Sequence, residues 1–291
     1  MTSRPVLTPS WSSLIASLPN LPALPAMPDT QESSAQSPAH QHVKPFVYES
    51  LNSKALHFSI SEIQSRMQIR DPHALDLEYT RTMMGFLLFK PEPGNIAMIG
   101  LGGGSLAKFC HRYLPRSRIQ VIEINPHVIA LRNDFHVPLN DERFTVVQGD
   151  GAQFVRLRAT RPDVLMVDGF DAQGLPSRLS SQRFYDDCAE MLQPDGIMVV
   201  NLHYGHASYD RHLERIRRSF SDAVLVIDDG ELSNSIVFAF KGAGMAQLRP
   251  GVVRRPKNLD ATAANQLLAA FALIVSALKD QGSTPSAARH R

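Results

Sequence analysis

Two carboxylates, Asp168 and Asp171, stand three positions apart directly after a short apolar run at residues 164–167. A run of this kind is typical of a strand buried on both faces, and ligands of open α/β sheets bind beyond the carboxyl ends of such strands. A pair of carboxylates there suits a cationic ligand, and one of them can accept a proton from an ammonium group. The plainer alternative, in which the side chains cap the loop, fits Asp171 better than Asp168.

A glycine-rich turn at residues 100–104, Gly-Leu-Gly-Gly-Gly, follows another apolar run at residues 96–99. Glycine lets the backbone turn tightly and approach a ligand, and the helix expected after the turn points its amide N–H groups at that ligand. Gly100 and Gly102 are therefore candidate ligand-contacting residues. The dinucleotide-binding pattern G-x-G-x-x-G needs glycine or alanine at its sixth position, where this chain has Ser105, so a dinucleotide site is disfavoured.

Two further acidic residues follow the next expected strands. Glu123 comes about 20 residues after the glycine turn, where a carboxylate accepts the hydroxyl hydrogens of a ribose; a solvated strand end is the alternative. Asp150 follows the run at residues 145–149 and can accept from the exocyclic amine of adenine, while Gly151 leaves the backbone open to the ring. Asp150 also suits the N-cap of a helix expected at residues 151–159, and its two oxygens permit both roles.

Other side chains that could bind a metal or react form no recognisable site. His203 and His206 follow another expected strand, but two histidines at i, i+3 without a third ligand do not make a metal site. Cys110 and Cys188 have neither metal-type spacing nor a disulfide framework, so we predict two reduced thiols and no metal. The arginines between residues 211 and 218 are predicted to form a solvated helix face rather than a nucleic-acid stripe, because acidic residues neighbour them.

The elements that must position these residues alternate regularly from residue 95 onward. Apolar runs predict strands at residues 95–100, 118–123, 144–148, 163–168 and 196–202. Amphipathic patterns predict helices at residues 104–113, 126–135, 151–159, 180–192 and 208–219. Two later runs, 223–227 and 234–240, indicate a closing hairpin. This alternation predicts an α/β fold with a mostly parallel sheet covered by helices.

The flanking segments have different patterns. Residues 45–70 alternate apolar and polar side chains as in a small antiparallel sheet, and a stripe at helical spacing predicts a helix over residues 75–89. Residues 1–44 are rich in Pro, Ser, Ala and Gln, which predicts a mobile tail. A last amphipathic helix is predicted at residues 259–279, with a frayed end at 280–291. The predicted domains are the tail 1–44, a small β-sheet 45–74, the main α/β domain 75–245, and a C-terminal helix and tail 246–291.

The overall composition is that of a globular protein, with 43% apolar and 20% charged residues in 291. A net charge of +2 gives no field that would attract nucleic acid. We find no apolar run near the roughly 20 residues that span a bilayer, and the polar N-terminus lacks the apolar core of a secretory signal. We therefore predict a cytoplasmic protein without nucleic-acid or membrane partners.

Taken together, several motifs in a fixed order make the chain resemble the spermidine synthase family, the polyamine aminopropyltransferases. The resemblance covers roughly residues 45–242. Its marks are the glycine turn, Val121-Ile-Glu-Ile-Asn-Pro126, Gly149-Asp-Gly151, the pair Asp168 and Asp171, Phe184-Tyr185 and Leu192-Gln-Pro-Asp-Gly196, with Ile63-Gln64 and Tyr79-x-x-x-Met83 upstream. Several motifs in the correct order are far more specific than any one alone.

The resemblance implies a Rossmann-like methyltransferase-type domain preceded by a small antiparallel β-domain. It also implies a reaction, in which an aminopropyl group moves from decarboxylated S-adenosylmethionine to a polyamine amine without a metal. By position in the motifs, Asp168 would be the base, Asp171 would hold a substrate ammonium and Tyr79 would orient the amine. A homodimer is a further suggestion of the resemblance.

For the donor, the resemblance implies that Glu123 holds the ribose, Asp150 the adenine and Gln64 the nucleoside. The chain departs from the family where Gly103 replaces an Asp of the glycine turn, a residue that faces the aminopropyl ammonium and disfavours a donor carboxylate. Thr80 and Ala172 likewise replace the usual His and Pro. Two alternatives therefore stay open, an S-adenosylmethionine-dependent methyltransferase and a non-catalytic nucleoside-binding module.

Overall fold

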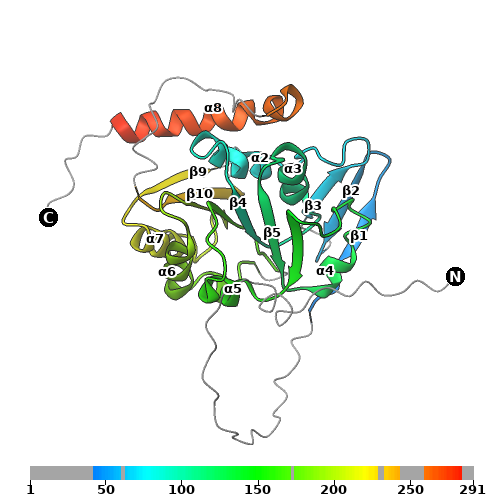
Figure 1. Cartoon of the computed structure of the whole chain (residues 1–291), viewed down its shortest axis with the longest axis horizontal. Helices are drawn as coiled ribbons and strands as arrows, with labels where there is room; N and C mark the ends of the chain where they lie inside the picture. The colour runs from blue at the N-terminus through cyan, green and yellow to red at the C-terminus, as the bar shows by residue number, and fades with distance from the viewer. Residues whose placement is uncertain (1–41, 60–62, 172–173, 229–232, 243–258, 284–291) are drawn as a thin grey trace, which may run out of the picture.

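The computed structural model describes residues 42–59, 63–171, 174–228, 233–242 and 259–283, and a seven-stranded sheet lies at its centre (Figure 1). The strands are β4 (Asn95–Ile99), β5 (Arg118–Glu123), β6 (Phe144–Gln148), β7 (Val164–Val167), β8 (Ile197–His203), β9 (Val224–Asp228) and β10 (Asn234–Phe240). They follow the order β6-β5-β4-β7-β8-β10-β9. The strands from β4 to β8 run parallel, and β10 pairs antiparallel with both β8 and β9. The predicted mostly parallel sheet and its closing hairpin are confirmed.

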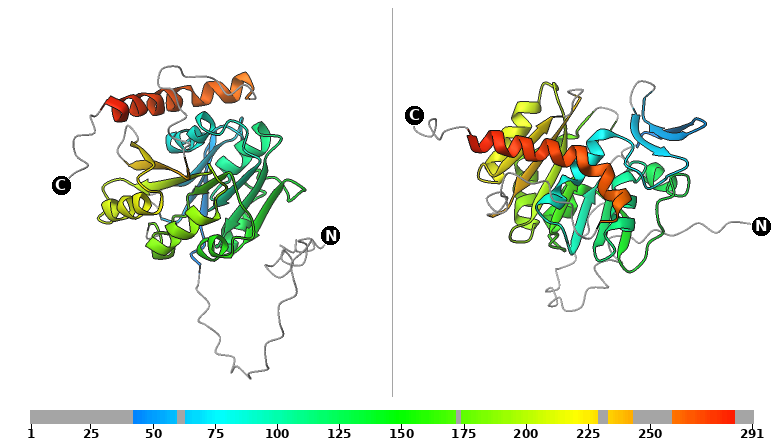
Figure 2. Two further views of the ribbon diagram at one scale, coloured as in Figure 1. Left: turned by 60° about the vertical axis from the view of Figure 1, so that its left-hand side comes forward. Right: turned by 90° about the horizontal axis from the view of Figure 1, so that it is seen from above.

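Helices cover both faces of this sheet (Figures 1 and 2). They are α2 (Glu78–Met83), α3 (Ser105–Tyr113), α4 (Pro126–Ala130), α5 (Gly151–Leu157), α6 (Gln182–Met191), α7 (Tyr209–Ser219) and α8 (Ala261–Ser283). Neighbouring residues of one strand point to opposite faces, so Met98 joins the core beneath α3 and α8, whereas Ile99 joins the core beneath α5 and α6. The apolar runs are continuous because each strand is buried on both faces.

A separate three-stranded antiparallel sheet precedes the main domain, as predicted. Its strands are β1 (Phe46–Glu49), β2 (Ser53–His57) and β3 (Ile63–Gln68). Leu56 and Met67 are fully buried and belong to the same core as α3. This packing places β3 near the glycine turn of the main domain, where a Cβ at Gly102 would lie 3.5 Å from the Cβ of Ser65.

The helix predicted over residues 75–89 is shorter and divided. Regular α2 begins only at Glu78, and a 3₁₀ segment, η1 (Met84–Leu88), follows it. The preceding backbone is held by other elements, since the Leu75 N–H donates to Gln266 Oε1 of α8 at 2.9 Å. At Gly85 a Cβ would lie only 2.1 Å from Ile274 of α8, so the close approach of two helices needs glycine there. Glycine favours the α-helix poorly, and the chain tightens at this point.

The helix predicted over residues 126–135 is α4, and it ends at Ala130. The chain then turns back so that Phe135 is buried against the glycine turn. Lys108 of α3, itself fully buried, donates from Nζ to the Phe135 carbonyl at 2.8 Å. Burial lowers the pKa of Lys108 to about 8. A tertiary contact thus overrides the helical pattern of the last five predicted residues.

The last helix, α8, is longer than predicted and continues to Ser283 through residues expected to fray. Residues 261–280 have a mean hydropathy of 1.7 and are long enough to cross a bilayer, which corrects the sequence-based statement that no such run exists. Leu267, Phe271 and Ile274 are nevertheless fully buried in the domain core. The helix lies across α2 and the β9 edge of the sheet (Figures 1 and 2).

Most of the predicted tail, residues 1–41, lies outside the described residues, as does the segment 243–258. At its start the described chain is docked, because the Val43 carbonyl accepts from Asn125 Nδ2 at 2.8 Å. The domain boundaries at 44/45, 74/75 and 245/246 stay predictions.

Candidate active site

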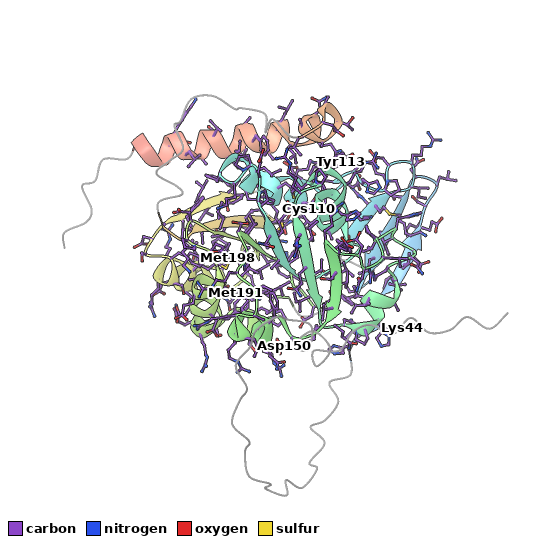
Figure 3. All side chains as sticks on the ribbon, viewed as in Figure 1. Lys44, Cys110, Tyr113, Asp150, Met191 and Met198 are labelled. Carbon is purple, nitrogen blue, oxygen red and sulfur yellow. The ribbon has the colours of Figure 1, made fainter. Side chains whose placement is uncertain are left out.

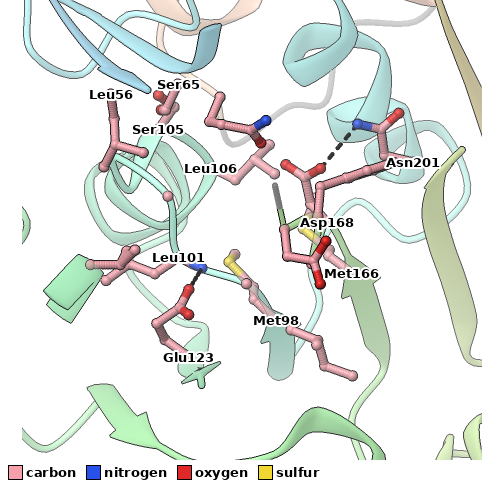
Figure 4. Close-up of a pocket in the computed structure, with 18 of the residues that line it drawn as sticks. Leu56, Ser65, Met98, Leu101, Ser105, Leu106, Glu123, Met166, Asp168 and Asn201 are labelled. Atoms are coloured by element: carbon pink, nitrogen blue, oxygen red, sulfur yellow. Dashed lines mark hydrogen bonds between the residues drawn. The ribbon is translucent and has the colours of Figure 1, made fainter. Parts of the chain in front are cut away.

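A cavity of about 1180 Å³ opens at the carboxyl ends of the parallel strands, between the main sheet and the small N-terminal sheet (Figure 4). The structure brings to this cavity every residue to which the sequence analysis gave a role in binding or proton transfer. The lining includes Gln64, Tyr79, Gly100, Gly102, Glu123, Asp150, Gly151, Asp168 and Asp171. These residues come from β3, α2 and the loops after β4, β5, β6 and β7. Short turns at the strand ends therefore collect side chains that are far apart in the sequence.

Asp168 is a half-buried carboxylate on the cavity wall, held by two side chains. Its Oδ1 accepts from Asn201 Nδ2 at 3.0 Å (Figure 4). Its Oδ2 accepts from the Tyr79 hydroxyl at 3.1 Å. Burial raises the pKa of Asp168, and these two hydrogen bonds oppose that rise. Burial and the neighbouring Asp168 raise the pKa of Tyr79, so its phenol stays a hydrogen-bond donor. Such a carboxylate can accept a proton from a ligand that enters the cavity.

Asn201 was not identified as a site residue from the sequence. It lies in β8, next to β7, and is almost fully buried. The sequence did contain a signal that could have identified Asn201. It is a polar residue inside the apolar run Ile197–Leu202, and a buried amide needs a hydrogen-bond partner. Its partner, Asp168, is 33 residues away, and only the pairing of β7 with β8 reveals it.

Glu123 is buried, which rules out the solvated strand end considered above. Its Oε2 accepts from the Leu101 N–H at 2.8 Å (Figure 4). Its Oε1 accepts from the Asn125 N–H, also at 2.8 Å. Burial raises the pKa of Glu123, and the backbone hydrogen bonds oppose that effect. The side chain holds the glycine turn to the β5–α4 turn, and it still lines the cavity. Each carboxylate oxygen has a second lone pair with which a hydroxyl group can be bound.

Asp150 lies at the edge of the sheet where α5 begins (Figure 3). Its Oδ1 accepts from the Ala152 N–H at 2.8 Å, so the predicted N-cap is confirmed. Its Oδ2 forms an ion pair with Arg178 NH1, also at 2.8 Å. Arg178, which the sequence analysis did not single out, belongs to the 3₁₀ turn η2 (Ser177–Leu179) and lines the same cavity.

Glycine is needed at each of these positions in the site for a different structural reason. Gly100 has φ +97°, and a Cβ there would lie 2.2 Å from the Asp168 carbonyl oxygen, so only glycine lets the two strand ends meet. Gly102 has φ +52° and opens toward Ser65 of β3. Gly151 requires a correction, because its Cβ would lie 2.4 Å from Ile99 Cγ2. Close packing on β4, and not an opening toward a ring, excludes a side chain at that position.

Gly103, the position at which the chain departs from the resembled family, is enclosed. A Cβ there would lie 2.7 Å from the Ser65 hydroxyl oxygen and 2.8 Å from the Phe135 ring. Phe135 cannot withdraw easily, since it is fully buried and its carbonyl accepts from Lys108. The neighbours of Gly103 therefore fill the space that a side chain would need.

The Asp171 N–H donates to the Gly174 carbonyl at 2.9 Å, and the Gly174 N–H donates to the Asp171 carbonyl at 3.2 Å. Phe170 precedes it and meets His203 edge to face, with ring centroids 6.2 Å apart. His203 and His206 both line the cavity on this side. Among the residues that the structure describes, no group of three His, Cys, Asp or Glu side chains could hold a metal ion. Both cysteines, Cys110 and Cys188, are buried thiols.

Comparisons with known proteins agree with this geometry. The model of the spermine/spermidine synthase domain family matches residues 76–226. A polyamine aminopropyltransferase of Neisseria meningitidis is 38% identical over 198 residues, which are 67% of this chain and 75% of the relative. A similar enzyme of Chromobacterium violaceum is 38% identical over 191 residues, 65% of this chain and 73% of the relative.

Solved structures extend the likeness of the fold. A spermidine synthase in complex with the transition-state analogue AdoDATO has a TM-score of 0.55 at 20% identity, over 82% of this chain and 88% of that one. Human methyltransferase-like protein 13 in complex with SAH has a TM-score of 0.52 at 24% identity, over 70% of this chain and 93% of that one. At these identities the likeness shows a Rossmann-like methyltransferase fold and no more.

Proposed function

The chain belongs to the spermine/spermidine synthase family of transferases, and from this premise we propose that it moves an aminopropyl group from decarboxylated S-adenosylmethionine to a small amine. Asp168 is the proposed base. The observation that carries the proposal is the half-buried Asp168 carboxylate, held by Tyr79 and Asn201 on the wall of the cavity. Its raised pKa brings it closer to that of an amine, which favours proton transfer between the two.

In the proposed reaction the lone pair of the acceptor nitrogen attacks the aminopropyl carbon attached to the donor sulfonium. The new C–N bond forms as the C–S bond breaks, and the bonding electrons go to sulfur, which leaves as the neutral thioether of methylthioadenosine. The proton lost by the acceptor nitrogen passes to Asp168. The sulfonium supplies the leaving group, so the protein mainly has to align the reactants and hold a neutral amine.

On the donor side, Glu123 is proposed to bind the ribose hydroxyls, Asp150 the adenine amine and Gln64 the nucleoside. The glycine turn after β4, with Gly100 and Gly102, is proposed to bring backbone close to that ligand. Support comes from their common position on the cavity wall. Each proposed carboxylate is already oriented by backbone N–H groups, which reduces the cost of ordering it around a ligand.

On the acceptor side, Asp171 is proposed to hold a substrate ammonium and Tyr79 to orient the attacking amine. Asp171 lies in the loop after β7 and lines the cavity together with Phe170 and His203. A carboxylate on the cavity wall is a favourable partner for an ammonium group. We propose a small amine as the acceptor, a cytoplasmic site of action, a homodimeric state and a reaction that requires no metal.

A methyltransferase on the same fold is the second candidate, and Gly103 is the observation that favours it. Glycine at residue 103 has no acidic side chain that could repel a donor carboxylate. Ser65 and Phe135 also fill the space that such a side chain would need. Calorimetric titration with decarboxylated and ordinary S-adenosylmethionine separates the two candidates. Clearly tighter binding of the decarboxylated donor supports aminopropyl transfer, whereas equal or tighter binding of S-adenosylmethionine favours methyl transfer.

The proposed base is tested with Asp168→Asn, which keeps the size of the side chain. We expect the rate of methylthioadenosine release with decarboxylated donor and an amine panel to fall at least about 100-fold, because general base catalysis is lost. Methylthioadenosine should still bind by calorimetry. Asp222→Asn is the control, since its exposed carboxylate pairs with Arg217 outside the cavity.

An unchanged rate in Asp168→Asn would remove Asp168 from the mechanism. If the unaltered protein binds none of methylthioadenosine and the two donors, both catalytic candidates are excluded. The third reading, a nucleoside-binding module without activity, requires that methylthioadenosine binds while no donor is turned over with any acceptor.

A further inference from the structure

We propose that Arg178 is a specificity-determining residue that reads the edge of the donor base together with Asp150. Asp150 accepts from the exocyclic amine of adenine, and Arg178 donates to the neighbouring ring nitrogen. The inference rests on the proposed function, which places an adenine nucleoside in the cavity. It adds a hydrogen-bond donor, Arg178, to the single acceptor expected there, the Asp150 carboxylate.

The position of Arg178 comes first. The residue lies in η2, after the hydrogen-bonded pair of Asp171 and Gly174, and it crosses to the β6–α5 turn to pair with Asp150. Gly149, Gly169 and Leu179 line the same cavity around this pair. The Asp150–Arg178 ion pair therefore stands on the wall at the end of the cavity where the base is proposed to lie.

The remaining hydrogen-bonding capacity of Asp150 comes second. Its Oδ1 accepts from the Ala152 N–H at the start of α5 and its Oδ2 accepts from Arg178, and we take Oδ2 as the oxygen that a base amine approaches. A carboxylate oxygen has two lone pairs and can accept from both partners. A base amine bound to Oδ2 would consequently lie next to the guanidinium group.

The complementarity of this pair to adenine comes third. The exocyclic amine of adenine is a donor, and the ring nitrogens on either side of it, N1 and N7, are acceptors. Asp150 can only accept, while the planar guanidinium of Arg178 carries five donors and can serve a carboxylate and a ring nitrogen together. Side by side, the two groups present the acceptor and donor pattern that this edge of adenine requires.

The alternative is that Arg178 forms an ordinary surface ion pair. Its side chain is 55% exposed, and exposed ion pairs contribute little to stability. Removal of Arg178 should therefore leave folding almost unchanged, so a change in ligand binding reports on contact with the ligand.

Arg178→Met tests the proposal, because methionine keeps the aliphatic length and removes every donor. Calorimetry of the full chain with methylthioadenosine should give a Kd about tenfold higher than that of the unaltered protein, as expected for the loss of one charge-assisted hydrogen bond at a partly exposed site. Arg218→Met is the matched control, since Arg218 pairs with Glu214 on the exposed surface of α7. Its Kd should stay the same.

Two base analogues distinguish a hydrogen bond from an indirect effect. In the 1-deaza and 7-deaza forms of methylthioadenosine, one ring nitrogen is replaced by carbon. With the analogue that lacks the contacted nitrogen, Arg178→Met and the unaltered protein should bind equally well. With the other analogue, the tenfold difference should persist.

The inference is overturned if Arg178→Met binds methylthioadenosine as tightly as the unaltered protein, or if both deaza analogues show the same loss. These results leave the proposed function intact. Failure of the unaltered protein to bind methylthioadenosine overturns the proposed donor site and this inference with it.

Discussion

At the scale of single residues, the decisive feature is the Asp168 carboxylate, because its neighbours shift its pKa in opposite directions. Burial raises the pKa of Asp168, whereas the hydrogen bonds from Asn201 and Tyr79 favour its ionised form. A fully desolvated carboxylate would stay protonated and accept nothing, while a solvated one would be a weak base for an amine. The two hydrogen bonds therefore favour the form of Asp168 that can accept a proton, while burial makes that form a stronger base.

This balance makes the pH dependence of Tyr79→Phe predictable. In the proposed mechanism activity requires ionised Asp168, so the rate falls as the pH decreases through the pKa of this carboxyl. Loss of the tyrosine hydroxyl removes a hydrogen bond that lowers this pKa, so the acid limb of the kcat/KM profile should move to higher pH. The measurement is the rate of methylthioadenosine release across the acid range.

Tyr209→Phe is the control for this experiment. Its hydroxyl bonds to Ser235 Oγ at 2.9 Å, and it has no part in the Asp168 group. The control should keep the acid limb of the unaltered protein. An acid limb that moves to lower pH, or does not move, in Tyr79→Phe would contradict the assignment of Asp168 as the titrating base.

At the scale of elements, strand ends and tight turns decide where the side chains meet. The glycine turn after β4 touches Asp168 through Gly100, β3 through Gly102 and the buried Phe135 through Gly103. One turn therefore joins the small sheet, the donor side and the proposed base. The site depends on the shape of this turn as much as on any polar side chain.

Gly100→Ala tests the role of the turn. The new methyl group would overlap the Asp168 carbonyl oxygen in a backbone conformation, φ +97°, that alanine rarely adopts. We expect the free energy of unfolding to fall by about 3 kcal/mol or more, from the left-handed conformation and the overlap together. Urea denaturation followed by circular dichroism measures it.

Gly205→Ala separates the two contributions. Gly205 also has a positive φ, +75°, but a Cβ there would meet no atom within 4 Å. The expected loss is only about 1 kcal/mol, from the backbone conformation alone. Equal losses in the two variants would mean that the contact between Gly100 and Asp168 carries no energetic weight.

At the scale of the whole molecule, α8 closes the core on the side opposite α5 and α6. It lies over η1, where Gly85 permits contact with Ile274, and its Gln266 fixes the backbone at Leu75 just before α2. Because α2 carries Tyr79, the C-terminal helix supports the site from a distance. The apolar side chains of α8 therefore serve to pack this helix against the core of the domain.

Phe271→Ala measures this support. The side chain is fully buried, so its removal should lower the free energy of unfolding by about 3–5 kcal/mol. Leu273→Ala, on the exposed face of the same helix, should cost less than about 1 kcal/mol. If Phe271→Ala unfolds at the same urea concentration as Leu273→Ala, α8 does not belong to the cooperative core.

The sequence by itself determined the order of the strands along the chain, the class of the fold and the carboxylates at the strand ends. These features depend on patterns within a few residues, such as the apolar run before Asp168 or the spacing between Gly100 and Glu123. The tertiary structure alone decided the pairs that define the chemistry, Asn201 with Asp168 and Arg178 with Asp150. Local periodicity contains no information on which distant residues meet, because strand order and loop paths bring them together.

The same reason explains the two shortened helices. The patterns over residues 75–89 and 126–135 are helical, but contacts with α8 and the glycine turn hold parts of both segments in other conformations. Helix propensity is weak enough, at well under 1 kcal/mol for an ordinary residue, that a few buried contacts exceed it. Features that depend on neighbouring residues could thus be predicted from the sequence. Contacts between residues far apart in the chain could be seen only in the folded structure.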